Sequence, residues 1–200
     1  MDTKVLTPPI VDTDIWVYLT LSGYYQRIID YYGYLQFSDV VEQEIMNWQK
    51  NSEEFSTIAK TFERLKMTQS VRVIHFENFD TFTQASINHT LSEYGLKEVG
   101  IIEKNKGEFT SLLYALHTDI HRFKTNDRKF KETIEDHIDE TFTFVNWINI
   151  LDNYSTNFKE KLETQKLVDR KQLKMKQQNE AHKHTKQDPR WDKLKQLIKQ

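Results

Sequence analysis

The chain has 200 residues and a formal net charge of −2, a length that fits one domain core plus an appendage. Its 12% aromatic content, with five Gly and three Pro, excludes a collagen-like or disordered chain and favours a helix-rich fold. Because Cys is absent, disulfides and thiolate zinc sites are excluded. The sequence has no apolar run near ~18 residues and no leader-like start, so we expect a soluble, cytoplasmic protein with no membrane partner.

The charge is unevenly distributed along the chain. Residues 155–200 contain 13 Lys and Arg against 6 Asp and Glu, which leaves 15 against 24 in residues 1–154. This asymmetry predicts an acidic domain over residues 1–154 and a basic, helical C-terminal extension over residues 155–200.

The first predicted strand runs directly into two carboxylates. The apolar run Ile10-Val11 is followed by Asp12 and Asp14, and open α/β sheets bind ligands at the C-terminal ends of their strands. If the strand continues through both acids, their side chains point to the same side, and a bound cation is the usual reason for such crowding. Alternatively, Asp14 caps a helix that opens at Ile15, which leaves only Asp12 as a candidate ligand.

Strands and helices alternate along the rest of residues 1–154. The periodicity predicts helices over 23–32, 39–48, 50–68, 81–94, from 108 to about 116, and over 129–137 and 147–151, and strands over 34–37, 71–76, 120–125 and 141–145. Residues 96–107 read as a loop. The alternation indicates a three-layer α/β/α fold with a central, mainly parallel sheet.

Further acids fall near predicted strand ends. The helix after Ser38 carries Glu42 and Glu44 on different faces, and one of them could face the first carboxylate pair. Glu108, in a first helical turn, can stabilise the helix dipole or reach a metal. The strand over 120–125 ends at Asn126-Asp127. Right-handed crossovers bring C-terminal strand ends to one edge, so Asp12 and Asp127 are predicted to meet there.

Four segments, in this order and spacing, resemble the signatures of the PIN-domain nuclease family. They are Val11-Asp12-Thr13-Asp14, Phe37 to Ile45 with Glu44, Gly107-Glu108 before an apolar helix, and Lys124 to Phe130 with Asp127. The connection over 96–106 and the tail beyond Asn153 have no counterpart in the minimal family domain.

The resemblance implies a metal-dependent endoribonuclease that hydrolyses RNA phosphodiester bonds, and a toxin-like role. The implied Mg²⁺ or Mn²⁺ ligands are Asp12, Glu44, Glu108 and Asp127, with Asp14 as an additional candidate. Thr13, Thr125 and Asn126 would hold these ligands or a water through hydrogen bonds. An inhibitory, antitoxin-like protein partner and a homodimer are both compatible with the family.

An acidic site that acts on a polyanion needs basic groups around it. Arg122, Lys124, Arg128 and Lys129 lie near the fourth segment and are candidate nucleic-acid contacts. The alternative for each of them is an ordinary solvated face.

Other functions stay open at this stage. A non-catalytic RNA- or protein-binding module on the same fold, and a DNA-directed nuclease, are the main alternatives. Asp12-Thr13-Asp14 also resembles the start of haloacid dehalogenase phosphatases, but Trp16 stands where that pattern has Thr or Val. A zinc site at His117, Asp119 and His121 requires a continuous helix where we expect a turn.

The C-terminal extension is predicted to contain two helical pieces. In residues 155–178, four apolar side chains can pack on the body: Phe158, Leu162, Leu167 and Val168. After Asp188-Pro189, an amphipathic helix carries Trp191, Leu194, Leu197 and Ile198 on one side. This closing helix can dock on the acidic body or bind a partner, and the basic face of the first piece can bind nucleic acid.

Overall fold

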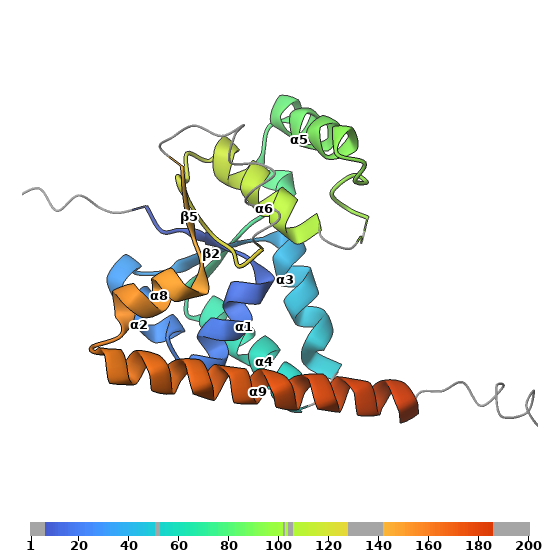
Figure 1. The fold of residues 1–200 in the computed structure, drawn as a ribbon. Coiled ribbons are helices and arrows are strands. Elements are labelled where there is room, and N and C mark those ends of the chain that lie inside the picture. The colour runs from blue at the N-terminus through green and yellow to red at the C-terminus, as the bar shows by residue number, and fades with distance from the viewer. Residues whose placement is uncertain (1–6, 51–52, 102, 104–105, 128–141, 186–200) are drawn as a thin grey trace, which may run out of the picture.

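The computed structural model describes residues 7–50, 53–101, 103, 106–127 and 142–185. Within these residues, five parallel strands form one sheet in the order β3-β2-β1-β4-β5 (Figure 1). The strands are β1 (Ile10–Val11), β2 (Leu35–Ser38), β3 (Val71–Ile74), β4 (Arg122–Lys124) and β5 (Thr143–Val145). Helices flank this sheet, so the predicted α/β fold with a parallel central sheet is confirmed.

The described helices divide between the two faces of the sheet. They are α1 (Thr13–Ser22), α2 (Tyr25–Tyr32), α3 (Asp39–Met46), α4 (Glu53–Met67), α5 (Thr81–Glu93), α6 (Lys106–His117), α8 (Trp147–Tyr154) and α9 (Phe158–Thr185), with 3-10 turns at Asn47–Lys50 and Phe76–Asn78. One buried cluster joins α1 to α4 with α8 and α9, and a second joins α5 and α6. Neighbouring β1 residues divide between them, because Val11 belongs to the first cluster and Ile10 to the second.

The larger core is built around an aromatic side chain of the first helix. Trp16 is fully buried and contacts Phe37 and Phe62 edge to face, with ring centroids 5.4 and 5.6 Å away. Such pairs add to the free energy of apolar burial. Helix α1 is therefore fixed against β2 and α4. Asp12, which directly precedes α1, is held in place with it.

The start of α1 corrects two predictions. The strand ends at Val11, and α1 begins at Thr13 with Asp12 as its N-cap residue. The predicted continuation of the strand through Asp14 is wrong, and so is the alternative in which Asp14 caps a helix. The physical reason is that Asp12 Oδ1 accepts the Ile15 N–H at 2.8 Å, which satisfies one of the donors that a helix start leaves free.

Most of the other predicted elements are confirmed with small shifts of their ends. Gly33, at a φ of 84°, ends α2 as expected, and Ser38 caps α3 through the Val41 N–H. The predicted strand over 120–125 is shorter, since β4 comprises only Arg122–Lys124. The predicted helices over 129–137 and after Asp188-Pro189 lie outside the described residues.

Helix α9 runs as one element along the face of the molecule that also holds α1 and α4 (Figure 1). Its Val168 and Met175 are buried in the larger core. Packing was correctly predicted for Val168 but is wrong for Phe158 and Leu162, which are 72% and 43% exposed. Within the described ranges, no helix combines the length and apolar composition that crossing a bilayer requires.

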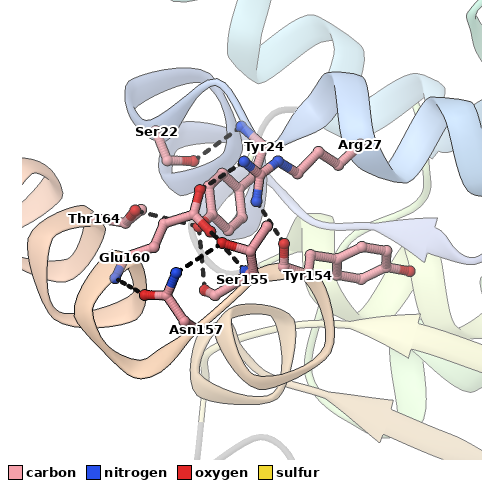
Figure 2. Close-up of polar contacts among 9 residues, drawn as sticks. Ser22, Tyr24, Arg27, Tyr154, Ser155, Asn157, Glu160 and Thr164 are labelled. Carbon is pink, nitrogen blue, oxygen red and sulfur yellow. Dashed lines mark hydrogen bonds and ion pairs between the residues drawn. The ribbon is translucent and has the colours of Figure 1, made fainter.

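Polar contacts fasten the start of α9 to the turn between α1 and α2 (Figure 2). The Tyr24 hydroxyl lies 3.1 Å from Ser155 Oγ and 3.2 Å from Thr164 Oγ1. Arg27 donates to the Tyr154 carbonyl and to Glu160, each at 2.6 Å. The guanidinium of Arg27, followed by hydrogen bonds from the Thr156 N–H and hydroxyl, lowers the pKa of Glu160 to about 2, as expected for a charge-assisted pair.

Candidate functional site

The sheet order defines a topological switch point at the C-terminal ends of β1 and β4. From β1 the chain proceeds outward through β2 and β3, and it then crosses to the other side of β1 to form β4 and β5. Asp12 follows β1 directly, its N–H donates to the Lys124 carbonyl at 3.1 Å, and Asp127 follows β4 three residues later. Open α/β sheets bind ligands in the crevice at such a point.

The carboxylate of Asp12 is the most buried acid at this edge. The residue is 1% exposed, and burial raises its pKa well above the ordinary value. The charges of Asp14 and Glu108 act in the same direction, whereas the neighbouring Thr125 side chain and the Ile15 N–H lower the pKa. Oδ1 accepts the Ile15 N–H, but Oδ2 is buried without a hydrogen-bond partner. Such an orphaned oxygen is costly unless a ligand engages it.

Four further acids, Asp14, Glu44, Glu108 and Asp127, interact electrostatically at the same edge. Burial raises the pKa of Glu108, and the charges of Glu44, Asp14 and Asp127 raise it further. Burial also raises the pKa of Asp14, together with the charge of Asp127. Asp12, Asp14, Glu44, Glu108 and Asp127 therefore form one group of mutually repelling carboxylates, which we call the acid edge.

Glu44 and Glu108 reach the acid edge from neighbouring helices. The Glu44 carboxylate accepts a hydrogen bond from the Thr13 hydroxyl. It also lies against Gly107, where an added Cβ would be 3.0 Å from Glu44 Oε1. Any side chain at position 107 would push this carboxylate away, so glycine there permits the close approach of α3 and α6.

The other glutamate of α3 faces away from the acid edge. Lys66 Nζ donates to Glu42 Oε1 at 2.6 Å on an exposed surface. The two side chains differ by about 200° around a helix, so only one of them can face the edge. The structure places Glu44 there.

The three predicted supporting residues all make hydrogen bonds near the acid edge. Thr13 holds Glu44. Thr125 Oγ1 accepts the Asp127 N–H at 3.1 Å, and the Asn126 side chain accepts the Trp147 N–H at 2.8 Å. Asn126 therefore joins the end of β4 to the start of α8, and Thr125 shapes the turn that carries Asp127. That either residue also supports a metal ligand or a water stays a prediction.

The acid edge offers only oxygen donors, the ligand type that a hard divalent ion prefers. Among the described residues, no three Asp, Glu or His side chains stand close enough together to hold one ion as they are arranged, and this includes the alternative at His117, Asp119 and His121. The chemistry does fit, because the donors are all oxygens and Asp12 Oδ2 has no other partner.

Two of the predicted nucleic-acid contacts, Arg122 and Lys124, do not lie at the acid edge. Lys124 is 2% exposed, and burial together with the charge of Arg122 lowers its pKa to about 8. Both side chains line a separate pocket between α2, β4, β5 and α8, and none of the acid-edge residues lines it. The alternative prediction, that Lys124 lies on an ordinary solvent-exposed surface, is therefore wrong. Arg128 and Lys129 lie outside the described residues.

A buried cation next to the site was missed in the sequence. Lys106, 1% exposed, donates through Nζ to the backbone carbonyls of Glu98, Val99 and Ile101. It fixes the connection between α5 and α6 just before Gly107 and Glu108. Its sequence context, a charged stretch read as a loop, contains no signal for burial.

Comparisons with known proteins gave one structural likeness. No protein-family model matches the chain, and no curated protein matches it. A solved structure with a similar arrangement is that of VapBC2 from Rickettsia felis bound to a DNA fragment from their promoter; its TM-score is 0.44 at 18% sequence identity, over 70% of this chain and 99% of that one.

Proposed function

We propose that the protein is a metal-dependent nuclease that hydrolyses RNA phosphodiester bonds with Mg²⁺ or Mn²⁺. The observation that carries the proposal is the acid edge: five carboxylates from four segments of the chain gather where β1 and β4 end. Burying mutually repelling charges is unfavourable for the fold, and such perturbed groups cluster at functional sites. The preference for RNA rests on the resemblance to PIN-domain nucleases.

Each acid has a distinct task in this proposal. Asp12 offers Oδ2 as a ligand atom, while its Oδ1 stays engaged with the Ile15 N–H and fixes the orientation of the carboxylate. Thr13 holds Glu44 against Gly107, and Glu108 and Asp127 complete the ligand set. A bound divalent ion supplies an activated water and neutralises charge on the scissile phosphate. No side chain of the protein needs to act as the nucleophile.

The test is a cleavage assay on single-stranded RNA with Mg²⁺ or Mn²⁺. Asp12→Asn and Asp127→Asn should abolish cleavage while circular dichroism shows an unchanged fold, because both acids are proposed ligands. Full activity in either variant would refute the metal-site proposal. A parallel assay on single-stranded DNA distinguishes an RNA-directed from a DNA-directed enzyme.

Glu44 and Glu42 provide a matched pair on one helix. Glu44→Gln should reduce cleavage by about 100-fold or more, since it removes a proposed ligand. Glu42→Gln removes only an exposed ion pair with Lys66 and should leave cleavage within about twofold. The reverse result would show that the ligand set is built from a different face of α3.

The second candidate is a non-catalytic RNA-binding module on the same fold. It is favoured by the finding that no three of the described acids stand at coordinating distance as arranged. The same assay separates the two functions. A module would bind RNA without cleaving it at any Mg²⁺ or Mn²⁺ concentration, and Asp12→Asn would strengthen binding by reducing repulsion of the phosphates.

A further inference from the structure

A second polar pocket lies on the molecule, and none of the acid-edge residues contributes to it. Its volume is about 510 Å³, and it is lined by Arg27, Tyr31, Tyr32, Arg122, Lys124, Thr143, Val145, Asn153 and Tyr154. Among the described residues, the lining contains three cationic side chains, three tyrosines and no carboxylate. The volume falls within the range of small-molecule sites.

Lys124 is the central charge of this pocket. The residue is 98% buried, yet it lines the cavity. Among the residues that the structure describes, its ammonium group has no hydrogen bond or ion pair with a protein group; its contacts are the rings of Tyr32 and Tyr154, whose centroids lie 6.0 and 5.9 Å from Nζ. A buried cation without a counter-charge is costly. An anion in the pocket would provide that counter-charge.

Arg122 adds a second charge beside Lys124, from the same face of β4. Its Nη1 donates to the Tyr32 hydroxyl at 2.9 Å, which orients the guanidinium. The planar guanidinium of Arg122 next to the ammonium of Lys124 can donate hydrogen bonds to several oxygens of one phosphate. Arg27 contributes to the wall instead, because it is already engaged by the Tyr154 carbonyl and by Glu160 (Figure 2).

The tyrosines supply flat apolar surface next to these charges. The ring of Tyr31 stands edge to face against those of Tyr32 and Tyr154, with centroids 4.8 and 6.1 Å apart. Figure 2 shows the Tyr154 ring directed away from the Glu160 contacts at the start of α9. Aromatic faces of this kind stack on nucleobases with little dependence on sequence. The Asn153 amide lines the same pocket and can pair with a base edge.

We propose that this pocket binds a free nucleoside monophosphate, with the phosphate held by Lys124 and Arg122 and the base placed among the tyrosines. The proposal is independent of the proposed nuclease activity, because the acid edge contributes no side chain to the pocket. The pocket volume of about 510 Å³ and the two neighbouring cations Lys124 and Arg122 fit one nucleotide rather than a chain of them.

The proposal is tested by isothermal titration of the full chain in EDTA with adenosine monophosphate, adenosine and inorganic phosphate. Adenosine monophosphate should bind more tightly than either fragment, because only it satisfies both the cations and the rings. Lys124→Met should weaken its binding by about tenfold or more. Lys60→Met, on the exposed surface of α4, makes the same charge change elsewhere and should alter the affinity by less than about twofold.

Arg122→Gln serves as a second variant in case Lys124→Met does not fold, and the same loss of affinity is expected. The proposal is overturned if adenosine monophosphate does not bind, if both pocket variants bind it normally, or if inorganic phosphate binds as tightly. Binding confined to a 5′-phosphorylated oligonucleotide would also overturn it. Nucleotide binding in EDTA, combined with no RNA cleavage in the separate assay with Mg²⁺ or Mn²⁺, would refute only the proposed nuclease. Cleavage in that assay without nucleotide binding would refute only this pocket.

Discussion

At Asp12, one carboxylate combines a structural and a chemical role. Oδ1 caps α1, whereas Oδ2 is buried and unpartnered. Asn keeps the capping oxygen and removes the buried charge, but Ala removes both. In EDTA, we predict that Asp12→Asn is at least as stable as wild type, and that Asp12→Ala unfolds with about 1 kcal/mol less free energy than Asp12→Asn. Urea unfolding measures this difference.

Neither Asp12 variant should gain stability from Mn²⁺, whereas wild type should, because binding to the folded state alone raises the free energy of unfolding. Equal stabilisation of all three proteins by Mn²⁺ would show that the ion binds elsewhere. If Asp12→Ala instead matches Asp12→Asn in EDTA, the cap contributes nothing to stability.

The acid edge should make the metal-free protein less stable as pH rises. Burial and neighbouring charges raise the pKa of Glu108 in the folded state, so the folded protein keeps a proton that the unfolded chain has already released. The contribution of the Glu108 carboxyl to the free energy of unfolding is fully favourable below about pH 4 and is lost as pH rises through the raised pKa. We predict that Glu108→Gln raises the free energy of unfolding by about 1 kcal/mol at pH 7.5 in EDTA, and by less at pH 4.5.

The free energy of unfolding, measured by chemical denaturation at several pH values, tests this prediction. Glu42→Gln, which removes the surface ion pair with Lys66, is the control. Saturating Mg²⁺ should reverse the order of wild type and Glu108→Gln at pH 7.5, since metal binding requires the deprotonated ligand. An unchanged order in Mg²⁺ would argue that Glu108 is not a ligand. A destabilising Glu108→Gln in EDTA would contradict the electrostatic account of the edge.

At the scale of single elements, α9 joins the body through a few buried side chains. Val168 is fully buried in the larger core, whereas Leu173 on the same helix is 58% exposed. We predict that Val168→Ala lowers the free energy of unfolding by about 2 kcal/mol and that Leu173→Ala changes it by less than about 0.5 kcal/mol. Urea unfolding tests both predictions, with the requirement that the free energy of unfolding falls with urea concentration at the same slope in the variants and the wild type. Equal small effects would show that α9 is held chiefly by its polar contacts.

Elements with strong local signals were predictable from the sequence. Ser38 before an apolar helix and Gly33 after one predicted the position of β2 between α2 and α3, because capping residues act locally. The start of α1 was not predictable in the same way. Asp12 fits both a strand end and a helix cap, and the packing of Trp16 in the core favours the helix together with the Asp12–Ile15 hydrogen bond.

The candidate site was partly predictable for a similar reason. The acids at strand ends could be found, since strand order and crossover handedness bring Asp12 and Asp127 to one edge. The burial of Lys124 could not, because alternation along β4 does not say which face α2 and α8 cover. Lys106 was missed for the same reason: its carbonyl partners lie in a connection without a periodic pattern.

For the whole molecule, the charge asymmetry sets the expected dependence of RNA binding on salt. The acidic residues 1–154 repel a polyanion, so basic residues elsewhere must supply the attraction. Residues 179–200 contain Lys183, Lys186, Arg190, Lys193, Lys195 and Lys199. The buried core residues described in α9 all precede position 179, the last being Met175.

Deleting residues 179–200 should therefore leave the protein folded, because the deletion removes no described core residue and no part of the acid edge. RNA affinity should become less dependent on salt, since each phosphate contact adds about 0.7 to the logarithmic slope for a single strand. Six lost contacts would reduce the slope by about 4.

Fluorescence anisotropy with a labelled RNA at several salt concentrations measures the slope, and replacing the six basic residues by Gln in the full chain is the matched control. If the Gln variant keeps the wild-type slope while a protein partner is lost on deletion, the segment binds protein rather than RNA; an unfolded truncated chain would show that it contributes to the core.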